Sequence, residues 1–115
     1  MIHIEDYYAP VIGEFEQLVL LALVRLGNGA YGASIRREIQ DRTRREVAIG
    51  TLYMTLARLE HKKMVVGYVG LPSRERGGRR RKHYLLNDLG QRALGRAYRA
   101  LMAMSAGMHT QLETL

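Results

Sequence analysis

The residues best suited to binding chemistry lie in one basic segment, residues 74–82. It contains six basic side chains and one acid, so it carries +5 of the formal net charge of +7. The adjacent Gly77 and Gly78 permit a turn with positive φ, which would expose the charged side chains. Such a local excess of positive charge favours a polyanion, above all nucleic acid, as the partner. A solvated loop without a partner would have the same composition.

Residues typical of catalytic and metal sites are scattered along the chain. The histidines His3, His61, His83 and His109 lack the spacing of metal ligands, and no serine lies in a nucleophile motif. The chain has no cysteine, which excludes disulfides and thiolate metal sites. Residues 27–32 resemble a phosphate-binding loop, but no lysine follows them. We therefore expect no enzyme activity, no metal and no other cofactor.

The composition is that of one globular domain. The chain has 115 residues, of which 47% are hydrophobic and 25% are charged. The longest apolar run, residues 18–24, is too short to span a bilayer, and the first residues lack the basic segment of a signal peptide. We expect a cytoplasmic protein that has no contact with membranes.

Three segments with helical periodicity precede the basic segment. Apolar residues nearly encircle residues 14–26, which predicts a helix buried on several sides, and Gly27 and Gly29 are suited to end it. A second helix with a short apolar stripe is predicted to begin near Tyr31. The third, over about 48–62, has an apolar stripe that would dock on the first two. That stripe consists of Ile49, Leu52, Leu56 and Leu59.

A second stripe of this third helix has residues suited to reading DNA. Thr51 and Thr55 each offer a hydroxyl and a methyl group to a base edge, and Met54 lies between them in sequence. Arg58 and Lys62, nearer the end of the helix, are better placed to contact phosphate. An ordinary amphipathic helix with a solvated face would show the same two stripes.

Tyr53 lies toward the apolar stripe of the third helix. A packing role and a phosphate contact through the hydroxyl are equally compatible with this position.

Strand-like sequences flank the basic segment. Residues 64–69 and 83–86 predict a β-hairpin with the basic segment at its tip. Three helices followed by a basic hairpin is the order found in a winged helix-turn-helix, with the hairpin as the wing. Wing residues are expected to contact phosphates or the minor groove. The residues assigned to this role are Arg76, Arg79, Arg80 and Lys82.

The last part of the chain predicts a fourth helix that begins after Asn87 and runs to the end. Asn87 can cap it, and apolar residues spaced by seven form a seam for a partner helix. Because the helix would be longer than the domain needs, we interpret the seam as a dimer contact; packing on the same chain is the alternative. The residues assigned to the dimer are Leu94, Ala97, Leu101, Met104 and Met108.

Tyr98 and Met102 lie on the same predicted helix and are candidates to line an effector pocket between protomers. The effector would be a small aromatic or apolar molecule. A methionine-rich stripe is more often part of a core than of a ligand site, so this pocket is an extension of the main hypothesis.

Four segments of the sequence resemble the PadR family of bacterial transcriptional regulators. They occur in the family's order and spacing, and the resemblance extends from about Gly13 to Leu94. It implies a winged helix-turn-helix domain followed by a C-terminal helix that forms a homodimer. It also implies transcriptional control, usually repression, with release by a small molecule in some members. The segments are residues 13–23, 30–35, 49–60 and 75–84.

Two positions depart from the family pattern. Lys63 stands where the family commonly has glycine, so it must either adopt a left-handed conformation, at a cost of about 1 kcal/mol, or end the helix differently. Asn87 replaces the usual threonine and can cap a helix equally well.

The sequence thus predicts a mainly α protein with a small β-hairpin. Its parts are an N-terminal segment, 1–12, a winged helix-turn-helix domain, 13–86, and a C-terminal dimerisation helix, 87–115. The expected function is that of a homodimeric repressor that binds a pseudo-palindromic operator in double-stranded DNA. A basic nucleic-acid-binding or architectural protein without sequence specificity is the alternative.

Overall fold

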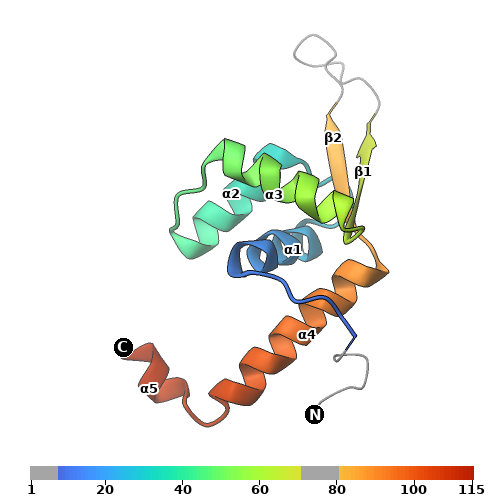
Figure 1. Cartoon of the computed structure of the whole chain (residues 1–115). Helices are drawn as coiled ribbons and strands as arrows, with labels where there is room; N and C mark the ends of the chain where they lie inside the picture. The colour runs from blue at the N-terminus through green and yellow to red at the C-terminus, as the bar shows by residue number, and fades with distance from the viewer. Residues whose placement is uncertain (1–7, 71–80) are drawn as a thin grey trace.

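The chain folds into a helical domain with a projecting hairpin and a C-terminal arm, which consists of the last two helices, Asp88–Ser105 and His109–Glu113 (Figure 1). The computed structural model describes residues 8–70 and 81–115. In chain order the elements are α1 (Glu14–Leu26), α2 (Gly32–Thr43), α3 (Ile49–His61), β1 (Val65–Val69), β2 (Lys82–Leu86), α4 (Asp88–Ser105) and α5 (His109–Glu113). This confirms the prediction of a mainly helical fold with a small antiparallel hairpin.

Helix α1 lies at the centre of the domain. It contacts α2, α3, α4 and β2, and Val19, Leu20 and Leu23 on it are buried. The apolar stripe predicted on α3 supplies the facing side of the core through Leu52, Leu56 and Leu59, whereas Ile49 is partly exposed. Burial of each such side chain contributes about 1.5–3 kcal/mol. The neighbours on several sides account for much of the apolar sequence of α1, whereas Leu21 and Val24 on this helix are exposed.

Lys63 ends α3 in the left-handed conformation, with φ of 62°. The N–H of Lys63 donates to the carbonyl of Glu60 at 3.0 Å, and the N–H of Met64 donates to that of Leu59 at 2.9 Å. This pair of bonds is the Schellman motif, which glycine usually completes. Met64, the next residue, is buried and anchors the turn into the core. Of the two outcomes anticipated for Lys63, the structure has the left-handed one.

The hairpin pairs β1 and β2 in antiparallel register, from Val65 opposite Leu86 to Val69 opposite Lys82. The middle of β2 is tied to the connection between α1 and α2: the N–H of Tyr84 donates to the carbonyl of Ala30 at 2.9 Å. The hairpin therefore leaves the domain at one end of α3, beside the start of α2 (Figure 1).

Helix α4 begins as predicted but ends early. The side chain of Asn87 accepts a hydrogen bond from the N–H of Gly90 at 3.1 Å, which confirms the cap. The expectation of one helix through residues 87–115 is wrong, because α4 stops at Ser105 and Gly107 has a positive φ of 78°. A short helix, α5, follows in a new direction (Figure 1). Glycine adopts this conformation readily and is a poor helix former, which accounts for the break.

Candidate nucleic-acid interface

Helix α3 turns one polar face away from the core. Thr51, Met54 and Arg58 on this face are exposed, and Met54 is 71% exposed. Ala57 and His61 are exposed on the same face and were not singled out from the sequence, although His61 follows Arg58 by three residues and Met54 by seven. Short side chains near the start of the helix and cationic ones near its end suit entry into a major groove.

Thr55 does not belong to this exposed face. Its residue is only 2% exposed, and its hydroxyl donates a hydrogen bond to the carbonyl of Thr51 at 2.8 Å. The prediction that Thr55 contacts a base edge is therefore wrong for this structure. The reason is helical geometry: Thr55 precedes Leu56 and follows Leu52 by three residues, so it turns toward the core with them.

Tyr53 lies against the start of α2. Its ring and hydroxyl are so close to Gly32 that a Cβ on Gly32 would overlap them. About half of Tyr53 is exposed. The side chain thus has a packing role, and a phosphate contact through its hydroxyl stays a prediction.

Two lysines assigned to DNA contact form ion pairs within the domain. Lys62 Nζ lies 3.4 Å from Oε2 of Glu16, and Lys82 Nζ lies 2.8 Å from Oε1 of Glu60. The hydrogen bond from Glu60 raises the pKa of Lys82 above its ordinary value of 10.5, against a smaller opposing effect of burial. The ammonium group of Lys82 is thus already oriented by a carboxylate.

The outer part of the described hairpin holds a group of aromatic side chains. The ring of His83 is stacked on Tyr68, with centroids 5.3 Å apart, and meets the edge of Tyr31 at 6.0 Å. Arg81 lies over the ring of Tyr31, 4.4 Å from its centroid. Nδ1 of His83 is 2.9 Å from the carbonyl oxygen of Gly29. Arg81, which the sequence did not single out, is thereby held at the point where the hairpin meets α2.

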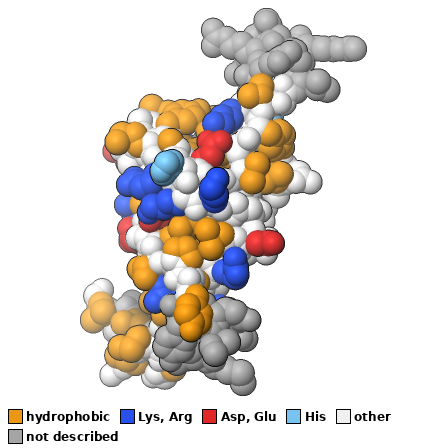
Figure 2. Space-filling view, turned by 45° about the vertical axis from the view of Figure 1, so that its right-hand side comes forward, with side chains coloured by type: hydrophobic (Ala, Val, Ile, Leu, Met, Phe, Trp, Pro, Cys, Tyr) orange, Lys and Arg blue, Asp and Glu red, His pale blue; other side chains and the backbone are white. Residues whose placement is uncertain are grey.

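Three of the basic residues assigned to the wing, Arg76, Arg79 and Arg80, lie outside the described residues. The described part of the hairpin ends with the pair Val69 and Lys82, after which the N–H of Gly70 donates to the carbonyl of Arg81 at 2.9 Å. Figure 2 shows that Lys and Arg side chains gather, together with a histidine, on the face below the hairpin. Patches of hydrophobic side chains lie on either side of them.

Residues 20–96 match the model of the transcriptional regulator PadR-like family. The chain belongs to this family. The match covers the second half of α1, the helix-turn-helix, the hairpin and the first half of α4. The family is one of transcriptional regulators rather than of enzymes.

Solved structures of PadR proteins have the same fold. A PadR family transcription regulator from hypervirulent Clostridium difficile is 28% identical, with 87% of this chain and 99% of that chain covered and a TM-score of 0.67. A PadR family transcriptional regulator from Eggerthella lenta is 27% identical, with 89% and 88% covered and a TM-score of 0.64. RosR of H. salinarum shares the fold. It is 24% identical, with 90% of this chain and 88% of that chain covered and a TM-score of 0.65. No curated protein has a matching sequence.

The seam predicted on the last helix of this PadR-like chain has two parts. Leu94 and Ala97 are partly buried and pack against the core of their own chain. Leu101, Met104 and Met108 are exposed, Met104 to 81%. Met108 lies beyond α4, at the start of α5. The single heptad seam thus divides into a root that is packed within the chain and an apolar surface that is open.

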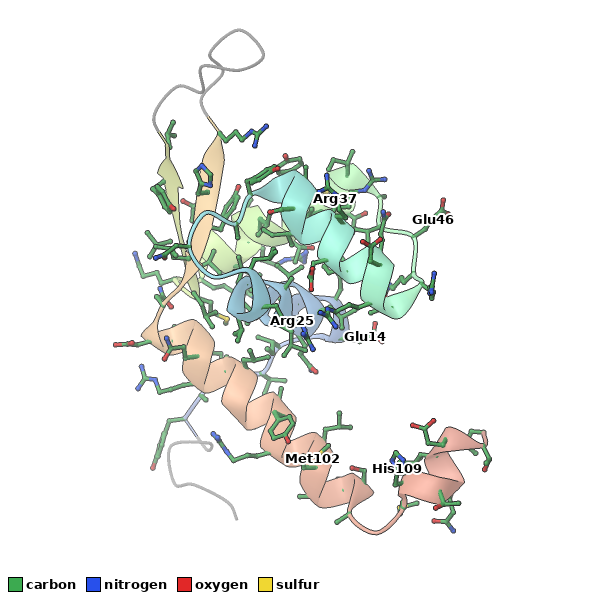
Figure 3. The ribbon with its side chains drawn as sticks, turned by 180° about the vertical axis from the view of Figure 1, so that it is seen from behind. Glu14, Arg25, Arg37, Glu46, Met102 and His109 are labelled. Atoms are coloured by element: carbon green, nitrogen blue, oxygen red, sulfur yellow. The ribbon has the colours of Figure 1, made fainter. Side chains whose placement is uncertain are left out.

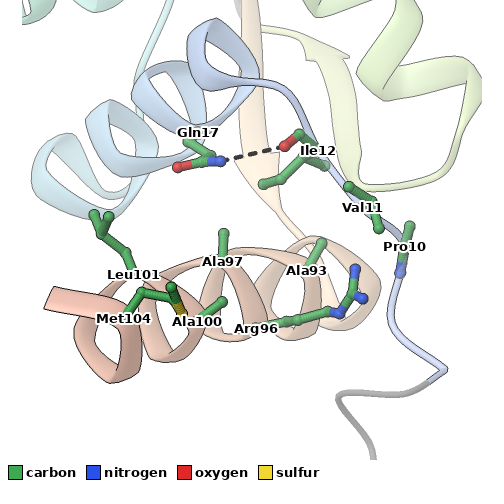
Figure 4. A pocket seen from close by; sticks show the side chains of 10 residues that line it. All are labelled: Pro10, Val11, Ile12, Gln17, Ala93, Arg96, Ala97, Ala100, Leu101 and Met104. Carbon is green, nitrogen blue, oxygen red and sulfur yellow. Dashed lines mark hydrogen bonds between the residues drawn. The ribbon is translucent and has the colours of Figure 1, made fainter.

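The residues predicted to line an effector pocket between protomers both lie on α4, and in the single chain that pocket stays a prediction. Tyr98 and Met102 are both exposed, and Met102 lies on the part of α4 that extends away from the domain (Figure 3). A groove of about 460 Å³ lies elsewhere, between α4, the start of α1 and the segment that precedes it. Ala93, Ala97, Ala100 and Leu101 form one wall of it, and Arg96 is the charged residue in its lining (Figure 4).

Within residues 8–70 and 81–115, no three His, Asp or Glu side chains are grouped so that they could hold a metal ion. In the same part of the chain, no helix combines the length and apolarity that crossing a bilayer requires.

Proposed function

We propose that this chain is a homodimeric repressor that binds a pseudo-palindromic DNA operator. The observation that carries the proposal is the exposed face of α3 beside the base of a basic hairpin, in a chain of the PadR-like family. The α3 helices of the two protomers would enter successive major grooves, about 34 Å apart. Such a regulator acts by binding rather than by catalysis, in the cytoplasm, where the DNA lies.

The proposed contacts fall into two groups. Thr51 and Met54 face the base edges, and Arg58 with the neighbouring His61 lies closer to the phosphates. Arg76, Arg79 and Arg80 supply affinity for the backbone or the minor groove. Lys62 adds positive charge beside α3, where Glu16 offsets part of it.

Binding to DNA is tested by competition. The purified chain should bind duplex DNA from its own promoter more tightly than random duplex, and random duplex more tightly than structured RNA. Equal affinity for both duplexes would favour the alternative, an architectural protein without sequence specificity. Absence of binding to any duplex at low salt would contradict the proposal.

The wing is tested by a salt titration. The double change of Arg79→Ala and Arg80→Ala should weaken binding to every DNA sequence and lower the slope of log K against log salt by up to about two units. An unchanged slope would remove these residues from the interface.

The proposed homodimer uses the open apolar surface of the C-terminal arm. The side chains of Leu101, Met104 and Met108 are all exposed to water. Contact between two protomers would bury this apolar surface, which is favourable. Leu94 and Ala97 then support α4 from within the chain.

Release by a small aromatic or apolar effector is the regulatory part of the proposal. The groove between α4 and the segment before α1 supports it, since its lining is mainly apolar. Phenolic acids and other planar aromatics should raise the melting temperature of the chain, and Ala100→Trp, which fills the groove, should abolish the shift. A shift that survives this change would place the effector elsewhere.

A further inference from the structure

Glu60 and Lys82 connect the end of α3 to the outermost described pair of the hairpin. Glu60 is in the last turn of α3, and Lys82 is the first residue of β2. Their Nζ to Oε1 distance is 2.8 Å, and both side chains are more than one-third exposed. An isolated pair of this exposure adds little to the free energy of unfolding. Its position gives it a different consequence.

The pair crosses β1 over Gly67. A Cβ built on Gly67 would lie 2.5 Å from Cε of Lys82 and 2.8 Å from Oε2 of Glu60. Gly67 is not one of the glycines that have a positive φ. Its backbone conformation therefore does not explain why this position lacks a side chain. The space above Gly67 is instead occupied by the lysine stem and the carboxylate. Because β1 has no side chain at Gly67, the side chains of Glu60 and Lys82 can reach each other across the strand.

The location of Lys82 determines what the contact can control. Lys82 pairs with Val69, the last residue of β1, and the remainder of the basic segment lies immediately before it in sequence. A tether at this point restricts the angle at which the hairpin leaves α3. Both α3 and the wing must meet the same stretch of DNA, so an error in this angle weakens all wing contacts together.

We infer that Glu60 is a positioning residue for DNA binding: by holding Lys82 across Gly67, it fixes the wing relative to α3. This inference rests on the proposed DNA-binding function. It assigns Lys82 to the tether rather than to a phosphate. It also gives an acidic residue, which would repel DNA on its own, a favourable role in binding.

The sign of the effect of Glu60→Gln distinguishes this role from simple electrostatics. Loss of one negative charge near DNA normally strengthens binding. The tether predicts the opposite, a loss of about fivefold in affinity for operator DNA. Glu38→Gln is the matched control, because Glu38 forms its ion pair with Arg42, inside α2, rather than with a residue of the described strands. Glu38→Gln should bind as tightly as the wild type or slightly more tightly.

Gly67→Ala breaks the tether without any change of charge. It should weaken operator binding to a similar extent, whereas Gly95→Ala, on α4, should have no effect.

The combined exchange Glu60→Lys with Lys82→Glu should restore affinity to within about threefold of the wild type, which a merely structural loss would not allow. Circular dichroism and urea unfolding check that each variant is folded. The pair is broken separately by Glu60→Gln, by Gly67→Ala and by Lys82→Gln, so a folding defect in one variant does not decide the test.

Lys82→Gln tests the assignment of the lysine. A tether predicts weaker binding with nearly the wild-type dependence on salt. A phosphate ligand predicts a slope lower by about 0.9 and no loss of affinity in Glu60→Gln. The inference is overturned if Glu60→Gln or Gly67→Ala binds operator DNA as tightly as the wild type. If the wild type itself binds no duplex, the proposed function fails, and the inference fails with it.

Discussion

Gly90, in the first turn of α4, lies directly against the carbonyl oxygen of Met64, so that a side chain on Gly90 would overlap it. The same carbonyl accepts the N–H of Asn87 at 3.2 Å, and the amide of Asn87 donates to the carbonyl of Lys63. The start of α4 is therefore docked on the turn that ends α3. Through this contact the C-terminal arm is attached to the end of the candidate recognition helix.

Gly90→Ala should destabilise the chain by about 1–3 kcal/mol, since the added methyl must displace backbone rather than a flexible side chain. Urea unfolding measures the change. Gly95→Ala is the control: its Cβ would meet only the guanidinium of Arg99, and alanine is the better helix former, so stability should be equal or higher by up to about 1 kcal/mol. Equal stability of Gly90→Ala and wild type would contradict the close packing.

Lys63→Gly should stabilise the chain by about 1 kcal/mol, because glycine adopts the left-handed conformation without the steric cost that lysine has there. Thermal and urea unfolding measure it. The neighbouring Lys62→Gly should lower stability by about 0.5–1 kcal/mol, since Lys62 has an ordinary φ of −76°, where glycine adds flexibility, and its exposed ion pair with Glu16 is lost as well. The prediction is wrong if both changes destabilise equally.

Thr51→Val and Thr55→Val separate an exposed threonine from a buried one. Thr51→Val should alter the preference between operator variants by about 1 kcal/mol, because the exposed hydroxyl is available to a base. Thr55→Val should leave that preference unchanged, because its side chain is buried. Competition binding with single-base operator variants gives both values. A shifted preference in Thr55→Val alone would reverse the assignment.

Stability should fall at alkaline pH through Tyr84. Burial raises the pKa of its phenol above the ordinary value of 10.0, so the unfolded chain loses this proton at a lower pH than the folded chain. The stabilising effect is complete below pH 10 and is lost as the pH rises through the folded pKa. Urea unfolding at pH 9 and pH 11 should show a smaller loss for Tyr84→Phe than for the wild type. The exposed Tyr8→Phe should follow the wild-type curve.

Met104→Glu should dissociate the proposed dimer, because it would place a charge in the apolar contact between protomers. Sedimentation velocity would show a monomer, and operator affinity would fall with it. Ala103→Glu adds the same charge at the neighbouring exposed position, outside the predicted heptad seam, and should remain dimeric. If both variants sediment as the wild type does, the C-terminal arm is not the dimer contact.

Local signals in the sequence were sufficient for most elements. The periodicity of α1 and α3, the strand-like flanks and the Asn87 cap predicted elements that the structure has. The error at α4 arose because heptad spacing continues across Gly107, where the backbone turns away. A pattern of side chains does not report that one glycine in it adopts a positive φ.

Two features of the site, the burial of Thr55 and the groove beside α4, were not predicted from the sequence. Thr55 occupies a position near the boundary between the two faces of α3, and periodicity alone does not say on which side of that boundary a side chain lies. The groove beside α4 was not predicted, because it is formed by a face of α4 other than that of Tyr98 and Met102 and by the distant residues 10–12. Contacts between segments far apart in the chain leave little trace in local spacing.

The sequence by itself determined the order of the elements, the basic charge near the wing and the resemblance to PadR regulators, because these depend on residue types and short-range spacing. Only the tertiary structure decided which residues of α3 are exposed and that Glu60 reaches Lys82 across Gly67. The contact between Glu60 and Lys82 joins residues 22 positions apart in the chain. It depends on how helix and hairpin pack together, which no local pattern specifies.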